Sequence, residues 1–221
     1  MHLFSARNFY YIIFITVSAG FILAGCSGSR GPVNLTRAKR DVSFYYESGQ
    51  YQQEVKEILS KATVELNKLR LYDSSVVIFD VDETALSNYE HIKSLDFGYI
   101  SEDWDKYILS ARAKGIDEVK DFYTWLKRKG IRTIFLTGRS RRHYDATYKN
   151  LVREGYTDFD TLIVRPDSST APAAVFKSVE RLVLANMGYR IIASVGDQES
   201  DFATDNTGMK ILLPDYLYLV D

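Results

Sequence analysis

Short apolar runs alternate with helix-like segments along most of this 221-residue chain. The runs are rich in β-branched residues, which is typical of strands covered on both faces of a parallel sheet. Strands are predicted at Val76–Phe79, Thr133–Leu136, Thr161–Val164, Ile191–Val195 and Met209–Leu213, and helices at Glu118–Lys129, Arg141–Glu154 and Ala173–Met187. Strands that alternate with helices indicate an α/β fold with a three-layer, doubly wound parallel sheet.

Two further helices are predicted ahead of the first strand, at Leu35–Glu47 and Tyr51–Leu71. In the second segment apolar residues recur at three- and four-residue steps: Val55, Ile58, Leu59, Ala62, Leu66 and Leu69. This spacing places them on one face, so it predicts an amphipathic helix.

Three of the predicted strands end in polar residues. The first is followed by Asp80, Asp82 and Glu83, the second by Thr137-Gly138-Arg139, and the fourth by the segment from Asp197 to Asp201. Like charges at the end of a buried strand repel one another and resist leaving water, so they need a reason to be there. In open α/β sheets ligands bind beyond the carboxyl ends of the strands, where these side chains are expected to meet.

Crowded carboxylates are stable mainly when a cation neutralises them, and oxygen ligands favour a hard ion such as Mg²⁺. Asp80 and Asp197 are the expected ligands, with Asp201 behind them. A calcium-binding loop fits less well. The segment Asp80–Ala85 lacks the acidic or amide ligand expected at position five and the glycine expected at position six.

A phosphate ester held beside a metal and a carboxylate invites nucleophilic attack by that carboxylate. Asp80 would attack and form an aspartyl-phosphate, while Asp82 would protonate the leaving oxygen and then take a proton from water. To act as an acid, Asp82 must hold its proton more strongly than Asp80, which a neighbouring carboxylate and partial burial can arrange. The phosphoryl group needs fixed donors, for which Thr137, the amides around Gly138 and Lys177 are candidates.

Four segments together resemble the motifs of the haloacid-dehalogenase superfamily. They are Asp80-Val81-Asp82-Glu83-Thr84 with Leu86-Ser87-Asn88, Leu136-Thr137-Gly138-Arg139, Lys177 with Arg181, and Gly196-Asp197-Gln198-Glu199-Ser200-Asp201. Within the superfamily they are similar to the acid phosphatases that include plant vegetative storage proteins and bacterial lipoprotein phosphatases. The resemblance implies a haloacid-dehalogenase-like sheet with a small helical cap at about residues 85–116.

The resemblance also implies roles for individual residues. Asp80 is the nucleophile and a metal ligand, and Asp82 is the acid/base and binds the metal through its backbone carbonyl. Thr137 and Lys177 hold phosphate, and Asp197 and Asp201 complete an Mg²⁺ site. Glu199 departs from the pattern, because plant members tend to carry an aromatic residue there, so their substrate does not transfer directly.

Each segment also has a structural interpretation. Asp80 can cap a turn, the segment from Asp197 can open a helix, and a lone lysine on an amphipathic helix is usually solvated. To explain the whole pattern, these interpretations would all have to coincide at three strand ends in the right order, so together they are set aside. Lys127 and Lys129 remain the alternatives to Lys177 by position in the sequence.

The segment from Thr84 to Gly115 is the least sheet-like part of the chain and carries Tyr89, Phe97, Tyr99, Trp104 and Tyr107. These aromatic residues either stack on a flat leaving group such as a nucleobase or pack the core of the cap itself. His143, in a basic run, is expected at the surface. The chain has no Arg-His-Gly motif, so a phosphohistidine route is not expected.

Residues 1–25 have the order of a lipoprotein signal peptide. Arg7 precedes the apolar run Phe9–Leu23, which is shorter than the ~20 residues of a typical membrane span. Leu23-Ala24-Gly25-Cys26 resembles a lipobox, whose cysteine is acylated after cleavage; the alternative is an uncleaved signal anchor. We expect a lipidated tether at 26–34, a phosphatase domain at 35–221, and anchoring in a bacterial cell envelope. Because serine follows Cys26, the outer membrane is favoured.

The charge composition limits the kinds of binding partner that are expected. Lys plus Arg (28) nearly balance Asp plus Glu (29), so no basic surface for nucleic acid is expected. The favoured function is an Mg²⁺-dependent acid phosphatase that hydrolyses small phosphate monoesters, with nucleoside monophosphates as the first class to test. A non-catalytic storage or binding protein on the same fold is the alternative, a phosphotransferase side activity stays open, and so does a homodimer.

Overall fold

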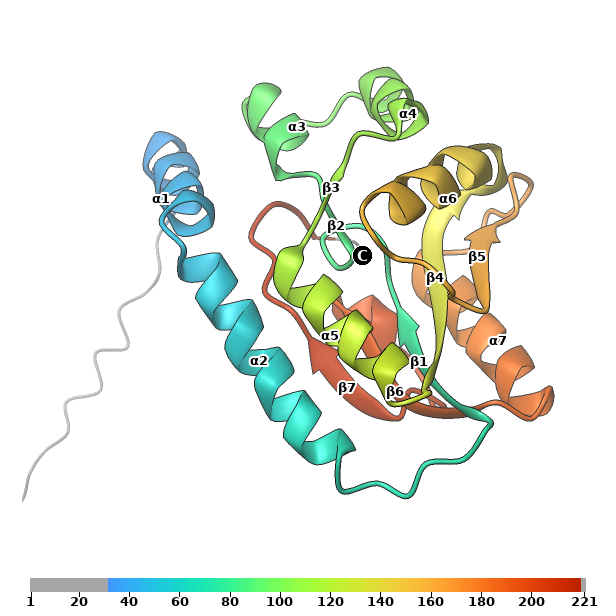
Figure 1. Ribbon diagram of the computed structural model, residues 1–221. Coiled ribbons are helices and arrows are strands. Elements are labelled where there is room, and N and C mark those ends of the chain that lie inside the picture. The colour runs from blue at the N-terminus through green and yellow to red at the C-terminus, as the bar shows by residue number, and fades with distance from the viewer. Residues whose placement is uncertain (1–31, 220–221) are drawn as a thin grey trace, which may run out of the picture. The chain divides into compact units, whose positions relative to one another are not determined.

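The centre of the fold is a five-stranded sheet in the order β5-β4-β1-β6-β7, seen in a computed structural model that describes residues 32–219 (Figure 1). The strands are β1 (Ser75–Phe79), β4 (Arg132–Ser140), β5 (Thr161–Arg165), β6 (Arg190–Gly196) and β7 (Met209–Leu212). Every neighbouring pair is parallel. All five predicted strands are therefore present, and the predicted doubly wound parallel sheet is confirmed.

Helices cover both faces of this sheet, which gives three layers (Figure 1). They are α5 (Asp117–Arg128), α6 (Tyr144–Arg153) and α7 (Ala173–Asn186). Alternate residues of β1 belong to different cores: Val77 and Phe79 pack with α2, α5 and α6, whereas Val76 and Ile78 pack with α7. The continuous apolar run of β1 is explained by this burial on both faces.

Two N-terminal helices precede the sheet, α1 (Leu35–Glu47) and α2 (Gln50–Leu66), joined by a sharp turn at Gly49 with a φ of 88°. The apolar face of α2 is buried as predicted, but the helix ends at Leu66 and not at Leu71. Leu69 and Leu71 remain exposed, so no packing extends the helix further. Among residues 32–219, no helix has the length and apolar character needed to cross a membrane.

An insertion between β1 and α5 forms a small separate layer. It contains β2 (Leu86–Ser87), α3 (Tyr89–Ser94), α4 (Ser101–Ser110) and β3 (Lys114–Gly115). The two short strands pair antiparallel and lead the chain out of the sheet domain and back into it. Two short 3₁₀ helices, η1 (Arg141–His143) and η2 (Glu199–Phe202), follow β4 and β6 at the same edge of the sheet. The carboxyl ends of β1, β4 and β6 therefore lie beneath the insertion.

Candidate active site

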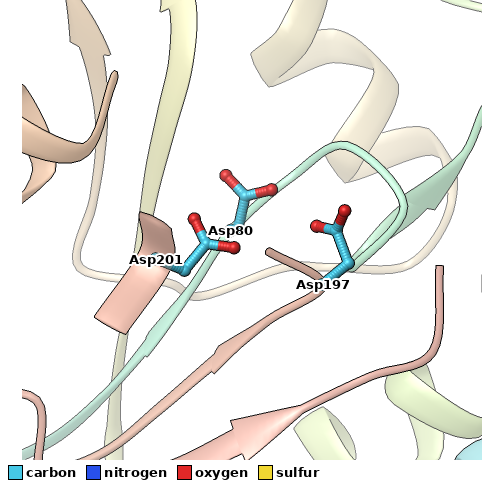
Figure 2. A group of neighbouring side chains, drawn as sticks. All are labelled: Asp80, Asp197 and Asp201. Atoms are coloured by element: carbon cyan, nitrogen blue, oxygen red, sulfur yellow. The ribbon is translucent and has the colours of Figure 1, made fainter. Parts of the chain in front are cut away.

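Three buried aspartates meet at the carboxyl edge of the sheet. Asp80 follows β1, Asp197 follows β6, and Asp201 lies in η2. Figure 2 shows the three carboxyl groups side by side, and one oxygen of each lies within 4.8 Å of the others. The structure therefore brings together groups that are more than a hundred positions apart in the sequence, because parallel neighbouring strands end at one edge.

Lys177 reaches this cluster from α7. Its ammonium donates a hydrogen bond to Asp80 Oδ1 at 2.5 Å and another to Asp201 Oδ1. Lys127 and Lys129 do not reach the cluster: Lys127 donates to the carbonyl of Asp158, and Lys129 lies over the ring of Trp125. Of the three lysines considered from the sequence, only Lys177 is at the site.

Burial dominates the electrostatics of the cluster. Burial and the charges of Asp201 and Asp82 raise the pKa of Asp80 to about 7, against the opposing effect of Lys177. Burial and the neighbouring carboxylates likewise raise the pKa of Asp197 well above its ordinary value. Burial acts to lower the pKa of Lys177, but the carboxylates outweigh it, so the net shift is upward. The fold therefore concentrates more negative charge here than one lysine neutralises.

The donor set fits a hard divalent cation. All three side chains offer carboxylate oxygens and are buried, and oxygen donors are what such ions prefer. Asp197 is also held in place, because Thr84 Oγ1 donates to its Oδ1 at 3.1 Å and Gln198 Nε2 donates to its Oδ2 at 2.7 Å. Fixed carboxylates of this kind are a preformed ligand set.

Asp82 has a different environment from Asp80. Arg139 donates to it through Nη2, 2.7 Å from Oδ1, and through Nε, 3.0 Å from Oδ2. Asn88 Nδ2 donates to Oδ1 at 2.8 Å. Burial alone would raise the pKa of Asp82, but Arg139 and Asn88 reverse the effect and lower it.

This arrangement contradicts one expectation from the sequence. Asp82 was expected to hold its proton more strongly than Asp80, yet in this geometry Asp80 has the higher pKa. The reason is Arg139, a buried side chain to which sequence analysis gave no role. The Thr-Gly-Arg segment near the end of β4 was a signal that could have identified it, since its arginine directly follows the expected phosphate donors.

The two expected phosphate donors on β4 lie in different positions. Gly138 lines the cavity above the aspartates. Thr137 is fully buried within the strand, and its hydroxyl accepts a hydrogen bond from the backbone N–H of Arg139 at 3.1 Å. Thr137 therefore helps to shape the irregular end of β4 that carries Gly138 and Arg139, where the pairing with β5 shifts register.

A cavity of about 720 Å³ opens above the carboxylates. Phe97, Tyr99 and Trp104 of the insertion line it, whereas Tyr89 stacks on Tyr46 of α1 and Tyr107 stacks on His91. The five aromatic residues singled out in the sequence therefore divide between the two uses considered, three facing the cavity and two with rings stacked on protein neighbours.

His143 is not at the surface, as the sequence suggested. It is 4% exposed, lines the cavity, and its Nε2 lies 3.2 Å from a carboxylate oxygen of Asp105. The predicted helix start at Arg141 is instead the 3₁₀ turn η1, which directs His143 inward, where Ser140 Oγ lies 3.2 Å from its Nδ1.

Comparison with known proteins agrees with this geometry. Residues 32–221 match the family described as HAD superfamily, subfamily IIIB (Acid phosphatase). Acid phosphatase 1 of Solanum lycopersicum is 30% identical over 177 residues, covering 77% of this chain and 69% of that protein. Vegetative storage protein 2 of Arabidopsis thaliana is 32% identical over 179 residues, covering 78% and 68% respectively.

Among solved structures, the class C acid phosphatase from Bacillus anthracis has a similar fold. The TM-score is 0.68 at 20% sequence identity, over 84% of this chain and 85% of that chain. The haloacid-dehalogenase fold expected from the sequence is thereby confirmed. With its motifs gathered at one edge of such a sheet, the chain belongs to the acid phosphatases of HAD subfamily IIIB and is a phosphomonoesterase.

Proposed function

We propose that this protein is an Mg²⁺-dependent acid phosphatase that hydrolyses small phosphate monoesters through an aspartyl-phosphate on Asp80. The observation that carries the proposal is the cluster of Asp80, Asp197 and Asp201, with oxygens within 4.8 Å of one another, and with Lys177 2.5 Å from Asp80. A metal that binds carboxylate oxygens and a fixed ammonium are the two positive groups that phosphoryl transfer needs.

In the proposed reaction, an oxygen of Asp80 attacks phosphorus, and the bond from phosphorus to the ester oxygen breaks. Asp82 gives a proton to the departing oxygen, a step that needs its acid form although Arg139 lowers its pKa. In the second half, water attacks the phosphoryl group on Asp80, Asp82 takes the proton of that water, and inorganic phosphate leaves. Lys177 and the backbone N–H groups around Gly138, at the irregular end of β4 that Thr137 helps to shape, hold the phosphoryl oxygens.

Asp80, Asp197, Asp201 and the backbone carbonyl of Asp82 would hold the metal. Bound there, Mg²⁺ supplies positive charge against the negative charge of the phosphoryl oxygens. The class C acid phosphatase of Bacillus anthracis has also been solved with tungstate bound. A tetrahedral oxyanion resembles phosphate in shape and charge, which supports phosphate binding by a protein of this fold.

Nucleoside monophosphates are the first substrates to test. A cavity of about 720 Å³ is within the usual range for a small-molecule site. Tyr99 and Trp104 on its wall offer flat faces to a base.

The deciding experiment uses the full-length chain in detergent, with 4-nitrophenyl phosphate and a panel of nucleotides, in MgCl₂ or in chelator. We expect turnover in MgCl₂, its loss in chelator, and a fall of about 10³-fold or more in kcat for Asp80→Asn, which removes the nucleophile. Turnover that survives chelation would remove the metal from the mechanism.

A storage or binding role is the second candidate, because two relatives are named vegetative storage proteins. The same assay separates the two. Absence of turnover on every substrate, with a folded chain and with MgCl₂ present, would favour storage or binding over catalysis.

We also propose that Cys26 carries a lipid that anchors the protein in a bacterial envelope, in the outer membrane. The support is the order of segments in the sequence: Arg7, the apolar run, small residues and then the single cysteine. Cys26 lies outside the described residues. Cys26→Ser should shift the protein from the membrane fraction to the soluble fraction or leave a longer precursor. An unchanged distribution and an unchanged length would contradict the anchor.

A further inference from the structure

The C-terminal segment after β7 crosses the active-site edge of the sheet. Leu217, Tyr218 and Leu219 line the same cavity as the catalytic aspartates. Asp215 fixes the segment there, because its Oδ2 accepts a hydrogen bond from Gln198 Nε2 at 2.8 Å. The position of Tyr218 is therefore set in part by Gln198, which lies between β6 and η2.

Asp215 has a second set of partners on the N-terminal side of the fold. Its Oδ1 accepts hydrogen bonds from the hydroxyl of Tyr46 at 3.3 Å and from the backbone N–H of Leu217 at 2.8 Å. Tyr46 belongs to α1 and is buried. Helix α1, although distant in sequence, thus helps to hold the C-terminal segment over the site.

Tyr218 joins a chain of short hydrogen bonds that ends at Asp82. Its hydroxyl donates to Glu83 Oε2 at 2.5 Å. Glu83 also accepts from Asn88, whose backbone N–H lies 2.6 Å from Oε1 and whose Nδ2 lies 2.9 Å from Oε2. The same Nδ2 donates to Asp82 Oδ1 at 2.8 Å.

The geometry at Asn88 links the position of Glu83 to that of Asp82. A side-chain amide nitrogen carries two hydrogens, and here one faces each carboxylate, so moving Glu83 would turn the amide away from Asp82. Glu83 and Asn88 are both buried, at 2% and 0% exposure. Buried hydrogen bonds to carboxylates are strong and costly to leave unmade, so the arrangement is well defined.

We propose that Tyr218 is a positioning residue for the phosphatase reaction, which acts through Glu83 and Asn88 to orient the carboxyl group of Asp82. The proposal rests on the proposed function, in which Asp82 gives the proton to the leaving oxygen. It assigns the C-terminal segment a part in catalysis that is separate from any contact its side chains make with the leaving group.

The role of Asp82 gives this proposal a specific kinetic signature. An alkoxide leaves poorly and depends on a well-aimed acid, whereas 4-nitrophenolate is a stable anion and leaves without much help. A misoriented Asp82 should therefore slow the hydrolysis of an alkyl phosphate far more than that of an aryl phosphate. A general distortion of the cavity would slow both.

The test compares Tyr218→Phe with wild type, using the full-length chain in detergent with MgCl₂. Phenylalanine keeps the ring and removes only the hydroxyl. We expect kcat/KM for glycerol 2-phosphate to fall about tenfold, part of the 10²–10⁴-fold that general acid catalysis supplies, and kcat/KM for 4-nitrophenyl phosphate to fall much less. Tyr216→Phe is the matched control, since Tyr216 is 58% exposed; its ring contact with Tyr45 survives the change, and both rates should stay at wild-type values.

A second variant tests the route. Asn88→Ala breaks the chain next to Asp82, so it should show the same selective loss, and adding Tyr218→Phe to it should cost little more. Equal losses on both substrates in Tyr218→Phe, or losses that multiply in the double variant, would overturn the proposal. If wild type is inactive, the proposed function fails; if wild type is active and Tyr218→Phe matches it on the alkyl ester, only the positioning role fails.

Discussion

At the scale of single residues, the site is defined by two aspartates only two positions apart that have opposite electrostatic environments. Asp80 faces other carboxylates and has a raised pKa, of about 7. Asp82 faces Arg139, which lowers its pKa although burial opposes the change. This order is the reverse of the one that a nucleophile at Asp80 and an acid at Asp82 require. A cation bound at the carboxylates would favour the charged form of Asp80 and so lower its pKa.

Arg139→Met tests how much the fold depends on this ion pair. Asp82 would remain largely buried without a charged partner, so we expect the free energy of unfolding at pH 8 to fall by about 3 kcal/mol. In wild type the pKa of Asp82 is lower in the folded protein than in the unfolded chain. The ion pair therefore stabilises the fold at pH values above the unfolded pKa, and this stabilisation is lost as pH falls through the folded pKa. In the variant, burial without Arg139 raises the pKa of Asp82. The destabilisation caused by its buried charge therefore decreases as pH falls through that raised pKa.

Urea unfolding at pH 8 and pH 5 measures the effect, and the difference between the two proteins should be smaller at pH 5. Arg142→Met is the control, because Arg142 pairs with Asp105 at an exposed site, with side-chain exposures of 61% and 32%. That change should cost under about 1 kcal/mol. Equal effects of the two substitutions would show that Arg139 is no more than a surface partner.

At the scale of elements, the segment from β6 into η2 supplies two of the three aspartates of the carboxylate cluster, Asp197 and Asp201. Gln198 and Asp201 form a reciprocal cap at the start of η2, in which the backbone N–H of Gln198 donates to Asp201 Oδ2 at 3.1 Å. This folds Asp201 back against Gly196, where an added Cβ would lie 2.6 Å from the Cβ of Asp201. Glycine is therefore required at this position for space.

Gly196→Ala should displace Asp201 and weaken the metal site. We expect a loss of about 1–3 kcal/mol in the free energy of unfolding, as is usual when a packed site is overfilled. Activity should need a higher Mg²⁺ concentration for half-saturation. Titrating activity with Mg²⁺ measures the second effect, and an unchanged titration curve with unchanged stability would contradict the close approach of β6 and η2.

At the scale of the whole domain, the active site is assembled from both ends of the described chain. Tyr46 of α1 binds Asp215 of the C-terminal segment, and Tyr46 also stacks on Tyr89 of α3, with ring centroids 4.8 Å apart. The segment from β6 into η2, which carries Asp197 and Asp201, is tied to the same C-terminal segment through Gln198. Binding at the carboxylates is therefore expected to stabilise the domain as one unit.

Mg²⁺ should raise the melting temperature more at pH 8 than at pH 5. Asp80 and Asp197 have raised pKa values in the fold, so these two groups hold more protons in the folded protein than in the unfolded chain. Without added metal, their contribution to stability is expected to fall as pH rises from about 4, the unfolded value, through the raised values, which for Asp80 is about 7. Mg²⁺ must displace those protons, so its binding is favoured at high pH.

At a concentration 100 times Kd, the stabilisation is about 2.7 kcal/mol, or roughly 5–10 °C for a domain of this size. Thermal unfolding in MgCl₂ and in chelator gives the measurement. Asp197→Asn should remove most of the shift. A shift of equal size at both pH values would mean that the metal binds elsewhere.

Much of this organisation was predictable from the sequence. The β-branched run at Val76–Phe79 and its counterparts determine the parallel sheet, since only a strand covered on both faces needs so continuous an apolar surface. Once the sheet is parallel, its topology sends every carboxyl end to one edge, so the meeting of Asp80 with Asp197 follows. Strand positions and the carboxylate cluster are therefore properties of local pattern combined with one general rule of α/β folds.

The environment of each carboxyl group was decided only by the tertiary structure. The partners of Asp82 and Glu83 include Arg139 and Tyr218, 57 and 135 positions away in sequence. His143 is buried because η1 turns it inward. Burial and charge at a side chain depend on which distant segments surround it, and no local periodicity specifies that. The sequence by itself thus determined where the acidic groups gather, while packing alone decided which charged and polar groups surround each of them.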